Sequence, residues 1–213
     1  MSSGEKERLL RHIITFGVTT DEAARRQYGE EGVGLLKLLL TEERIQNVGA
    51  VKAGDSVYTL HPNECLKRGL PLHYPADFTK RPQALLQSYL VLAFCVLGDV
   101  ERRIMRPQVL AESHPDFRSR GRHCIEGGAT KRIWRIFTPL SPRADMQTAR
   151  HISQAYQESQ RRPRDSAFRE LVTAGHYGFA VLLREEARAQ ALRALLSERP
   201  LPSHVSVRVE AIT

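Results

Sequence analysis

A change of hydrophobic pattern within residues 32–60 constrains the fold of this chain more than any other feature. The segment begins with apolar residues at helical spacing, which include Leu35, Leu36, Leu39 and Ile45. After Gly49 the pattern changes to two short β-like runs on either side of Gly54 and Asp55. The segment therefore predicts a helix that is followed by a two-stranded hairpin.

Two further helices are predicted ahead of this segment, over residues 5–16 and 21–28. The second follows Thr19 and Thr20, whose hydroxyl groups are suitable N-caps. Three short helices and a two-stranded wing are typical of a winged helix-turn-helix, which usually places its third helix in the major groove of DNA. We therefore predict four DNA-contacting side chains here: Lys37, Arg44 and Gln46 on the third helix, and Lys52 in the wing.

The same unit also fits a protein-protein interaction module. Glu42 and Glu43 belong to the predicted third helix, and their carboxylates would repel phosphate. Winged helices serve both purposes, so the pattern leaves the two alternatives open.

A proline-rich stretch separates the first part of the chain from the remainder. Pro71, Pro75 and Pro82 interrupt any regular element between residues 71 and 82. We predict a winged helix-turn-helix domain over residues 1–70, a linker over 71–82 and a mixed α/β domain over 83–213. The predicted fold class is α+β.

Residues 83–97 form the most apolar stretch of the sequence, QALLQSYLVLAFCVL. They predict a helix that is buried over most of its circumference and ends at Gly98. Such a helix must be covered, either by bridging the two domains or by a second copy, and we predict a homodimer through Gln83 to Leu97. It is shorter than the roughly 20 residues that cross a bilayer, so we expect no membrane contact and a cytoplasmic protein.

The second domain shows short β-like runs and then alternating helices and strands. The strands are predicted at residues 103–105, 108–111, 123–126, 132–138, 177–184 and 205–212, with the last at a sheet edge. The helices are predicted at residues 146–160, 166–174 with Ser166 as N-cap, and 185–198. This order is typical of a mixed α/β layer domain.

Positive charge is concentrated in the second half of the chain. Residues 1–80 carry 11 basic and 11 acidic side chains, whereas residues 81–213 carry 21 and 13. The excess lies mainly between Arg102 and Arg143, and a polyanion is the natural partner of such a segment. We predict that double-stranded DNA is bound there through Arg118, Arg120, Arg122, Lys131, Arg132 and Arg135. The alternative is an ordinary solvated face, and Trp134 is predicted to belong to the sheet core rather than to stack on a base.

Several short segments carry a resemblance to a known family. The run Leu35 to Leu39, the triplet Tyr58-Thr59-Leu60 and the run Leu66 to Leu70 resemble the winged helix of the plasmid replication-relaxation proteins. The order of elements after them is similar to the core of the PD-(D/E)xK nucleases. That resemblance implies a metal-binding carboxylate in Pro115-Asp116 and an acidic residue, a spacer and a lysine on a following strand.

The second nuclease element is missing from this sequence. The run RIWRIFT over residues 132–138 contains no carboxylate, and Glu126 is separated from Lys131 by four residues instead of one. A phosphodiesterase needs at least two convergent oxygen ligands for its metal ion, so we expect no catalysis, no metal and no cofactor. The prediction is a DNA-binding regulator of transcription or of plasmid or mobile-element replication. The alternatives are an interaction subunit of a larger assembly and a nuclease that uses Asp116 and Glu126.

Overall fold

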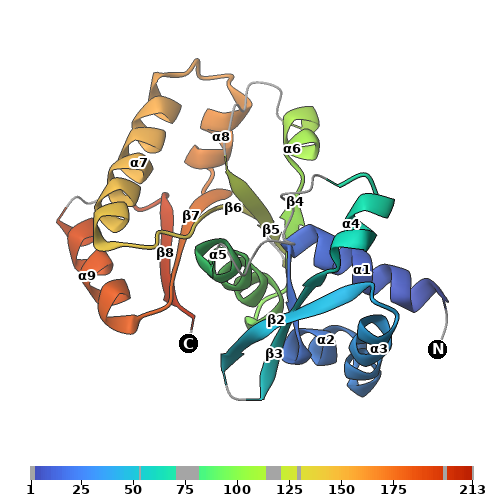
Figure 1. The fold of residues 1–213 in the computed structure, drawn as a ribbon. Coiled ribbons are helices and arrows are strands. Elements are labelled where there is room, and N and C mark those ends of the chain that lie inside the picture. The colour runs from blue at the N-terminus through green and yellow to red at the C-terminus, as the bar shows by residue number, and fades with distance from the viewer. Residues whose placement is uncertain are drawn as a thin grey trace. The chain divides into compact units, whose positions relative to one another are not determined.

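The chain forms two compact units, Met1–Gly98 and Asp99–Thr213. The structure is a computed structural model, and it describes residues 3–52, 54–70, 82–113, 121–128, 131–198 and 201–212. The first unit combines helices with a small antiparallel sheet, and the second combines helices with a mixed sheet (Figure 1). The α+β class predicted from the sequence is therefore confirmed.

The first unit contains a three-stranded antiparallel sheet in the order β1-β3-β2. Its elements follow the chain as α1 (Ser3–Phe16), β1 (Thr19–Thr20), α2 (Asp21–Tyr28), α3 (Glu30–Thr41), β2 (Ile45–Lys52), β3 (Asp55–Leu60), α4 (Pro62–Lys67), α5 (Pro82–Leu92) and the π-helical turn η1 (Ala93–Leu97). The first two helices and the hairpin at Gly54 confirm the prediction. Thr20 is the N-cap of α2, because its hydroxyl accepts the Ala23 N–H at 3.1 Å.

Apolar side chains from α1, α3 and the hairpin form the core of this unit. Leu9, Leu36 and Leu60 are completely buried within it. Two aspartates then fasten the hairpin to α2. Asp55 accepts the Glu22 N–H at 2.9 Å, and Asp21 accepts the Ser56 N–H at 3.1 Å and the Tyr58 hydroxyl at 3.2 Å.

The third helix differs from the predicted one at its C-terminal end. It ends at Thr41, and β2 already begins at Ile45, so the predictions that Arg44 and Gln46 lie on the helix and that the strands begin after Gly49 are wrong. Glu43 has a φ of 53°, and the Arg44 N–H donates to the Leu39 carbonyl. This left-handed residue closes a Schellman-type cap, which usually has glycine in that position.

The apolar stretch after residue 81 belongs to the first unit. Its helix ends at Gly98 as predicted, although its last turn is π-helical. Arg26 on α2 donates to the carbonyls of Leu97 and Gly98 at 3.1 and 2.8 Å, which ties this end to the unit. The division between the units therefore falls at residue 98 rather than at the expected linker, most of which lies outside the described residues. None of the described helices is long and apolar enough to cross a membrane.

The second unit contains a five-stranded sheet in the order β4-β5-β6-β7-β8. Its elements are β4 (Arg102–Met105), α6 (Pro107–Ser113), β5 (Arg122–Glu126), β6 (Arg132–Phe137), α7 (Pro142–Arg161), α8 (Ala167–Thr173), β7 (Tyr177–Leu183), α9 (Glu186–Ser197) and β8 (Ser206–Ala211). Strands β4, β5 and β6 are antiparallel, whereas β6, β7 and β8 are parallel. Helices α7 and α8 connect β6 to β7, and α9 connects β7 to the edge strand β8 (Figure 1).

Apolar residues of β7 form the centre of the second core. Tyr177, Phe179, Val181 and Leu183 alternate along the strand and pack with side chains of α7, α8 and α9. The predicted strands, the last two helices and the Ser166 N-cap are confirmed, with one exception. Residues 108–111 are helical and belong to α6, which begins at Pro107. Proline is favoured at the first position of a helix, because the backbone N–H that it lacks would have no partner within the helix. Helix α7 also begins before the predicted position, where the Ser141 hydroxyl caps it.

Two glycines of α3 test the packing of this helix on α2. A Cβ atom at Gly32 would lie 2.3 Å from the Ala24 carbonyl oxygen, whereas one at Gly34 meets nothing within 4 Å. We expect Gly32→Ala to lower the free energy of unfolding by about 1–3 kcal/mol through overpacking. Gly34→Ala should raise it by roughly 0.5–1 kcal/mol through helix propensity. Urea denaturation monitored by circular dichroism measures both, and equal effects of the two changes would contradict the described packing.

Candidate nucleic-acid interface

The four residues predicted to contact DNA in the first unit lie on three different elements. Lys37 is exposed on α3, and Gln46 is half-buried on β2. Arg44 lies in the turn between these elements, and Lys52 ends β2. Lys37 shares the exposed side of α3 with Glu30 and Glu31, so the helix that the sequence assigns to the major groove carries little positive charge.

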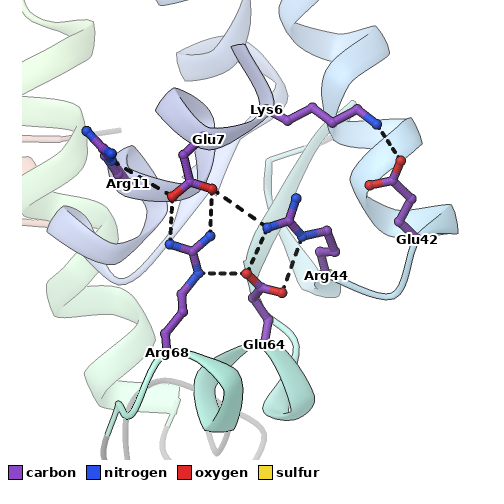
Figure 2. A network of polar contacts seen from close by, with 7 residues as sticks. All are labelled: Lys6, Glu7, Arg11, Glu42, Arg44, Glu64 and Arg68. Atoms are coloured by element: carbon purple, nitrogen blue, oxygen red, sulfur yellow. Dashed lines mark hydrogen bonds and ion pairs between the residues drawn. The ribbon is translucent and has the colours of Figure 1, made fainter. Parts of the chain in front are cut away.

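Arg44 belongs to a network of ion pairs rather than to an open surface (Figure 2). Its guanidinium donates two hydrogen bonds to the buried Glu64 on α4, at 2.9 and 3.2 Å. Arg68 donates to the same carboxylate at 2.6 Å and makes two bonds of 2.8 Å to Glu7 on α1. The network therefore joins α1, α4 and the start of β2.

The network shifts the proton affinities of its members. Hydrogen bonds from Arg44, together with those from Arg68, lower the pKa of Glu64 from 4.5 to about 2, although burial opposes the shift. Hydrogen bonding to Arg68 lowers the pKa of Glu7. The pKa of the Arg44 guanidinium is raised by its bond to Glu64. The carboxylates of Glu7 and Glu64 neutralise the guanidinium groups of Arg44 and Arg68. Arg44 therefore contributes to stability and not to an anion-binding surface.

Other cations in the described part of the first unit are also paired with its own carboxylates. Lys52 lies 2.6 Å from Glu22, and Arg25 lies 3.0 Å from Glu30. Residues 1–98 contain 12 basic and 11 acidic side chains. Arg8, Lys37 and Lys67 are exposed there and belong to no ion pair of the described residues, so the unit carries little net charge for a phosphate.

Where the structure describes the basic residues predicted in the second unit, they lie on more than one surface. Arg118 and Arg120 lie outside the described residues, while Arg122 and Lys131 are exposed at the beginnings of β5 and β6. Arg132 and Arg135 stand three positions apart on β6, so their side chains project from opposite faces of the sheet.

Arg132 and Arg135 are also engaged with neighbouring groups. Arg132 donates to the Gly175 carbonyl at 3.0 Å, and its guanidinium lies 5.3 Å from the centre of the Trp134 ring. Arg135 lies 5.0 Å from the centre of the Phe137 ring. Trp134 is only 1% exposed and packs across Gly178, where a Cβ atom would lie 2.6 Å from the indole. The core position predicted for Trp134 is confirmed, and its ring cannot stack on a base.

Glu126 is the centre of a second ion-pair cluster. One of its oxygens accepts from the Arg102 side chain at 2.9 Å, from the Trp134 indole at 3.1 Å and from Arg208 at 3.4 Å. A carboxylate surrounded by these donors is poorly suited to bind a cation. Asp116, the other carboxylate of the nuclease alternative, lies outside the described residues. In the part of the chain that the structure describes, no three His, Cys, Asp or Glu residues are grouped to hold a metal ion.

The structure also shows a basic surface that the sequence analysis did not single out. Arg143, Arg150 and Arg161 are exposed on the outer side of α7, and no ion pair within the described ranges includes them. Their separations of 7 and 11 residues are close to whole numbers of helical turns. The helix predicted over residues 146–160 excludes both Arg143 and Arg161, so the sequence did not place the three arginines on one helix.

Comparison of the chain with known protein families, with curated proteins and with solved structures finds no match.

The network at Glu64 gives a prediction about stability and pH. Glu64→Gln removes the anion between Arg44 and Arg68, so the free energy of unfolding at pH 7 should fall by about 2–4 kcal/mol. Because the pKa of Glu64 is lowered from 4.5 to about 2, its contribution is complete above pH 4.5 and is lost as the pH falls towards 2. Denaturant titrations of both proteins should therefore converge in acid.

Glu31→Gln is the matched control, because Glu31 is exposed on α3 and belongs to no ion pair in the described ranges. It should change the free energy of unfolding by less than about 0.5 kcal/mol. A difference between wild type and Glu64→Gln that is equally large in acid and at neutral pH would contradict the role given to the carboxylate.

Proposed function

We propose that this protein is a DNA-binding regulatory protein with an N-terminal winged helix and a basic C-terminal unit. The observation that carries the proposal is the location of its positive charge. Residues 99–213 contain 20 basic and 13 acidic side chains, and several exposed arginines there, such as Arg143 and Arg150, belong to no ion pair of the described residues. Unpaired guanidinium groups on a surface are suited to phosphates.

The order of elements in the first unit supports the winged-helix part of the proposal. Helix, short strand, two helices and a hairpin follow one another, with β3 in the middle of the sheet between β1 and β2. In this arrangement α3 would approach DNA through Lys37, and the hairpin would be the wing. The charge distribution favours the second unit as the source of most phosphate contacts.

The regulated process is proposed from the resemblance alone. The segments similar to plasmid replication-relaxation proteins favour control of plasmid or mobile-element replication in the cytoplasm, with control of transcription as the other possibility. The second unit would then be a nuclease-like domain that has lost catalysis and binds DNA. The ion pairs at Glu126 support that view, since they occupy one of the two carboxylates that catalysis would need.

An interaction subunit of a larger assembly is the second candidate function. The observation that favours it is the near-neutral charge of the first unit, in which Lys52, Arg44 and Arg25 are paired internally and α3 exposes Glu30 and Glu31. Such a surface suits another protein better than a phosphate backbone.

Binding to labelled duplex DNA across a salt series tests the proposal. We expect the affinity to fall steeply with salt, with a slope of about −0.9 per phosphate contact. Changing Arg118, Arg120 and Arg122 together to alanine should make the slope shallower by up to about 3. No binding at modest salt would favour the interaction subunit. Cutting that requires magnesium and disappears with Asp116→Asn would instead establish the nuclease.

The homodimer through Gln83 to Leu97 stays a prediction. Ser88 to Cys95 are each buried in the single chain, so a second copy would have to contact residues 82–87 or 96–97, which are half-buried or exposed. Sedimentation velocity at micromolar concentration measures the state directly. A dimer that Leu85→Glu dissociates would support the prediction, and a strict monomer would contradict it.

A further inference from the structure

The outer side of α7 carries a regular stripe of arginine and glutamine residues. Helix α7 has 20 residues and is about 30 Å long. Its inner side is buried and includes Ala149, Ile152 and Ala155. Exposed residues follow one another on the opposite side at spacings of 4, 3, 4, 3 and 4, and they are Arg143, Gln147, Arg150, Gln154, Gln157 and Arg161. At 3.6 residues per turn, these six positions lie in one line along the helix.

The composition of this α7 stripe is unusual for a solvated helix face. Such faces usually combine acidic and basic residues at i and i+4, which stabilise the helix. The α7 stripe contains no carboxylate, and the nearest one, Glu158, lies beside it and pairs with Arg162 at 3.2 Å. Its three arginines therefore present positive charge that no described side chain neutralises.

Helix α7 is also held firmly in the second unit. Asp145 in its first turn receives two hydrogen bonds from Arg188 on α9, at 2.7 and 3.1 Å. The inner residues belong to the core that includes β7. Charges on such a packed helix keep fixed separations, so they can match a partner whose charges are also held in fixed positions.

We infer that the α7 stripe binds the phosphate backbone of duplex DNA. Along the helix axis Arg150 is roughly 10 Å from Arg143, and Arg161 is roughly 16 Å from Arg150. Each DNA strand winds around the duplex once in about 34 Å, so a straight helix of this length beside the duplex crosses the backbones of both strands. The three arginines then reach separate phosphates on those backbones. The glutamine amides between them donate hydrogen bonds to the intervening backbone oxygens.

This inference rests on the proposed DNA binding and goes beyond it by naming the surface. The α7 stripe also differs from the set of residues predicted from the sequence. Most of that set is paired with other groups, lies on opposite faces of the sheet or falls outside the described residues. An acidic protein is the other partner that could neutralise three arginines. The alignment of three unpaired arginines over roughly 27 Å favours an extended polyanion, although the half-exposed Met146 borders the α7 stripe.

The test is binding of the full-length protein to a labelled duplex of about 30 base pairs at several salt concentrations. Changing Arg143, Arg150 and Arg161 together to glutamine should weaken binding about 30-fold or more near 0.1 M salt. The slope of log affinity against log salt should become shallower by about 2–3. Changing the same three residues to lysine keeps the charges and should cost less than about 5-fold.

The control changes three exposed cations of the first unit, Arg8, Arg25 and Lys67, to glutamine; of these Arg25 is paired, with Glu30 at 3.0 Å. It alters the net charge equally and should weaken binding less than about 3-fold. If the wild type binds DNA and both triple glutamine variants bind it equally well, the α7 assignment is overturned and the proposed function stands. No DNA binding by the wild type would overturn the proposed function. Binding to polyglutamate instead of DNA, lost in the α7 variant, would replace DNA with an acidic protein.

Discussion

Pairing between guanidinium and carboxylate groups decides which surfaces of this protein can hold an anion. The chain contains 26 arginines among its 32 basic residues and only 24 acidic residues. In the first unit Glu7 and Glu64 each bind arginine side chains, and in the second Glu126 and Asp145 do the same. An arginine held in this way contributes to the fold. Only an exposed arginine outside these clusters has its full charge available to a partner.

Because of this pairing, the two units have different proposed roles. In the first unit Arg44, Arg68 and Lys52 belong to internal ion pairs, and the network at Glu64 joins helices to the hairpin (Figure 2). The second unit has more arginines than carboxylates, and its longest helix carries three of the surplus on one line. The account therefore assigns stability to the paired clusters and partner binding to the outer side of α7.

Much of the fold could be predicted from local patterns. Hydrophobic spacing indicated the first two helices, Thr20 and Ser166 indicated N-caps, and the continuous apolar run of β7 indicated a buried strand. The end of α3 could not be predicted, because Glu43 adopts a left-handed conformation that sequence reasoning reserves for glycine. The short run after Pro107 was assigned to a strand, since a few apolar residues fit either a strand or a helix.

The candidate site could be predicted only in part, because the number of charges in a segment does not show which side chains share a surface. Such a count places Arg132 and Arg135 together, although a strand directs them to opposite faces. It also cannot show that Arg44 and Arg102 are bound by carboxylates distant in the sequence. Arg143, Arg150 and Arg161 are separated by near-whole numbers of helical turns. This spacing places them on one side only once all three are known to belong to the same helix.

The most direct test of this account is the reactivity of individual arginines towards phenylglyoxal, measured by mass spectrometry with and without duplex DNA. The account predicts slow modification of Arg44, Arg68 and Arg102 under both conditions. It predicts fast modification of Arg143, Arg150 and Arg161 in the free protein and strong protection when DNA is bound. Equal reactivity of the paired and unpaired arginines, or protection by DNA that leaves α7 untouched, would contradict it.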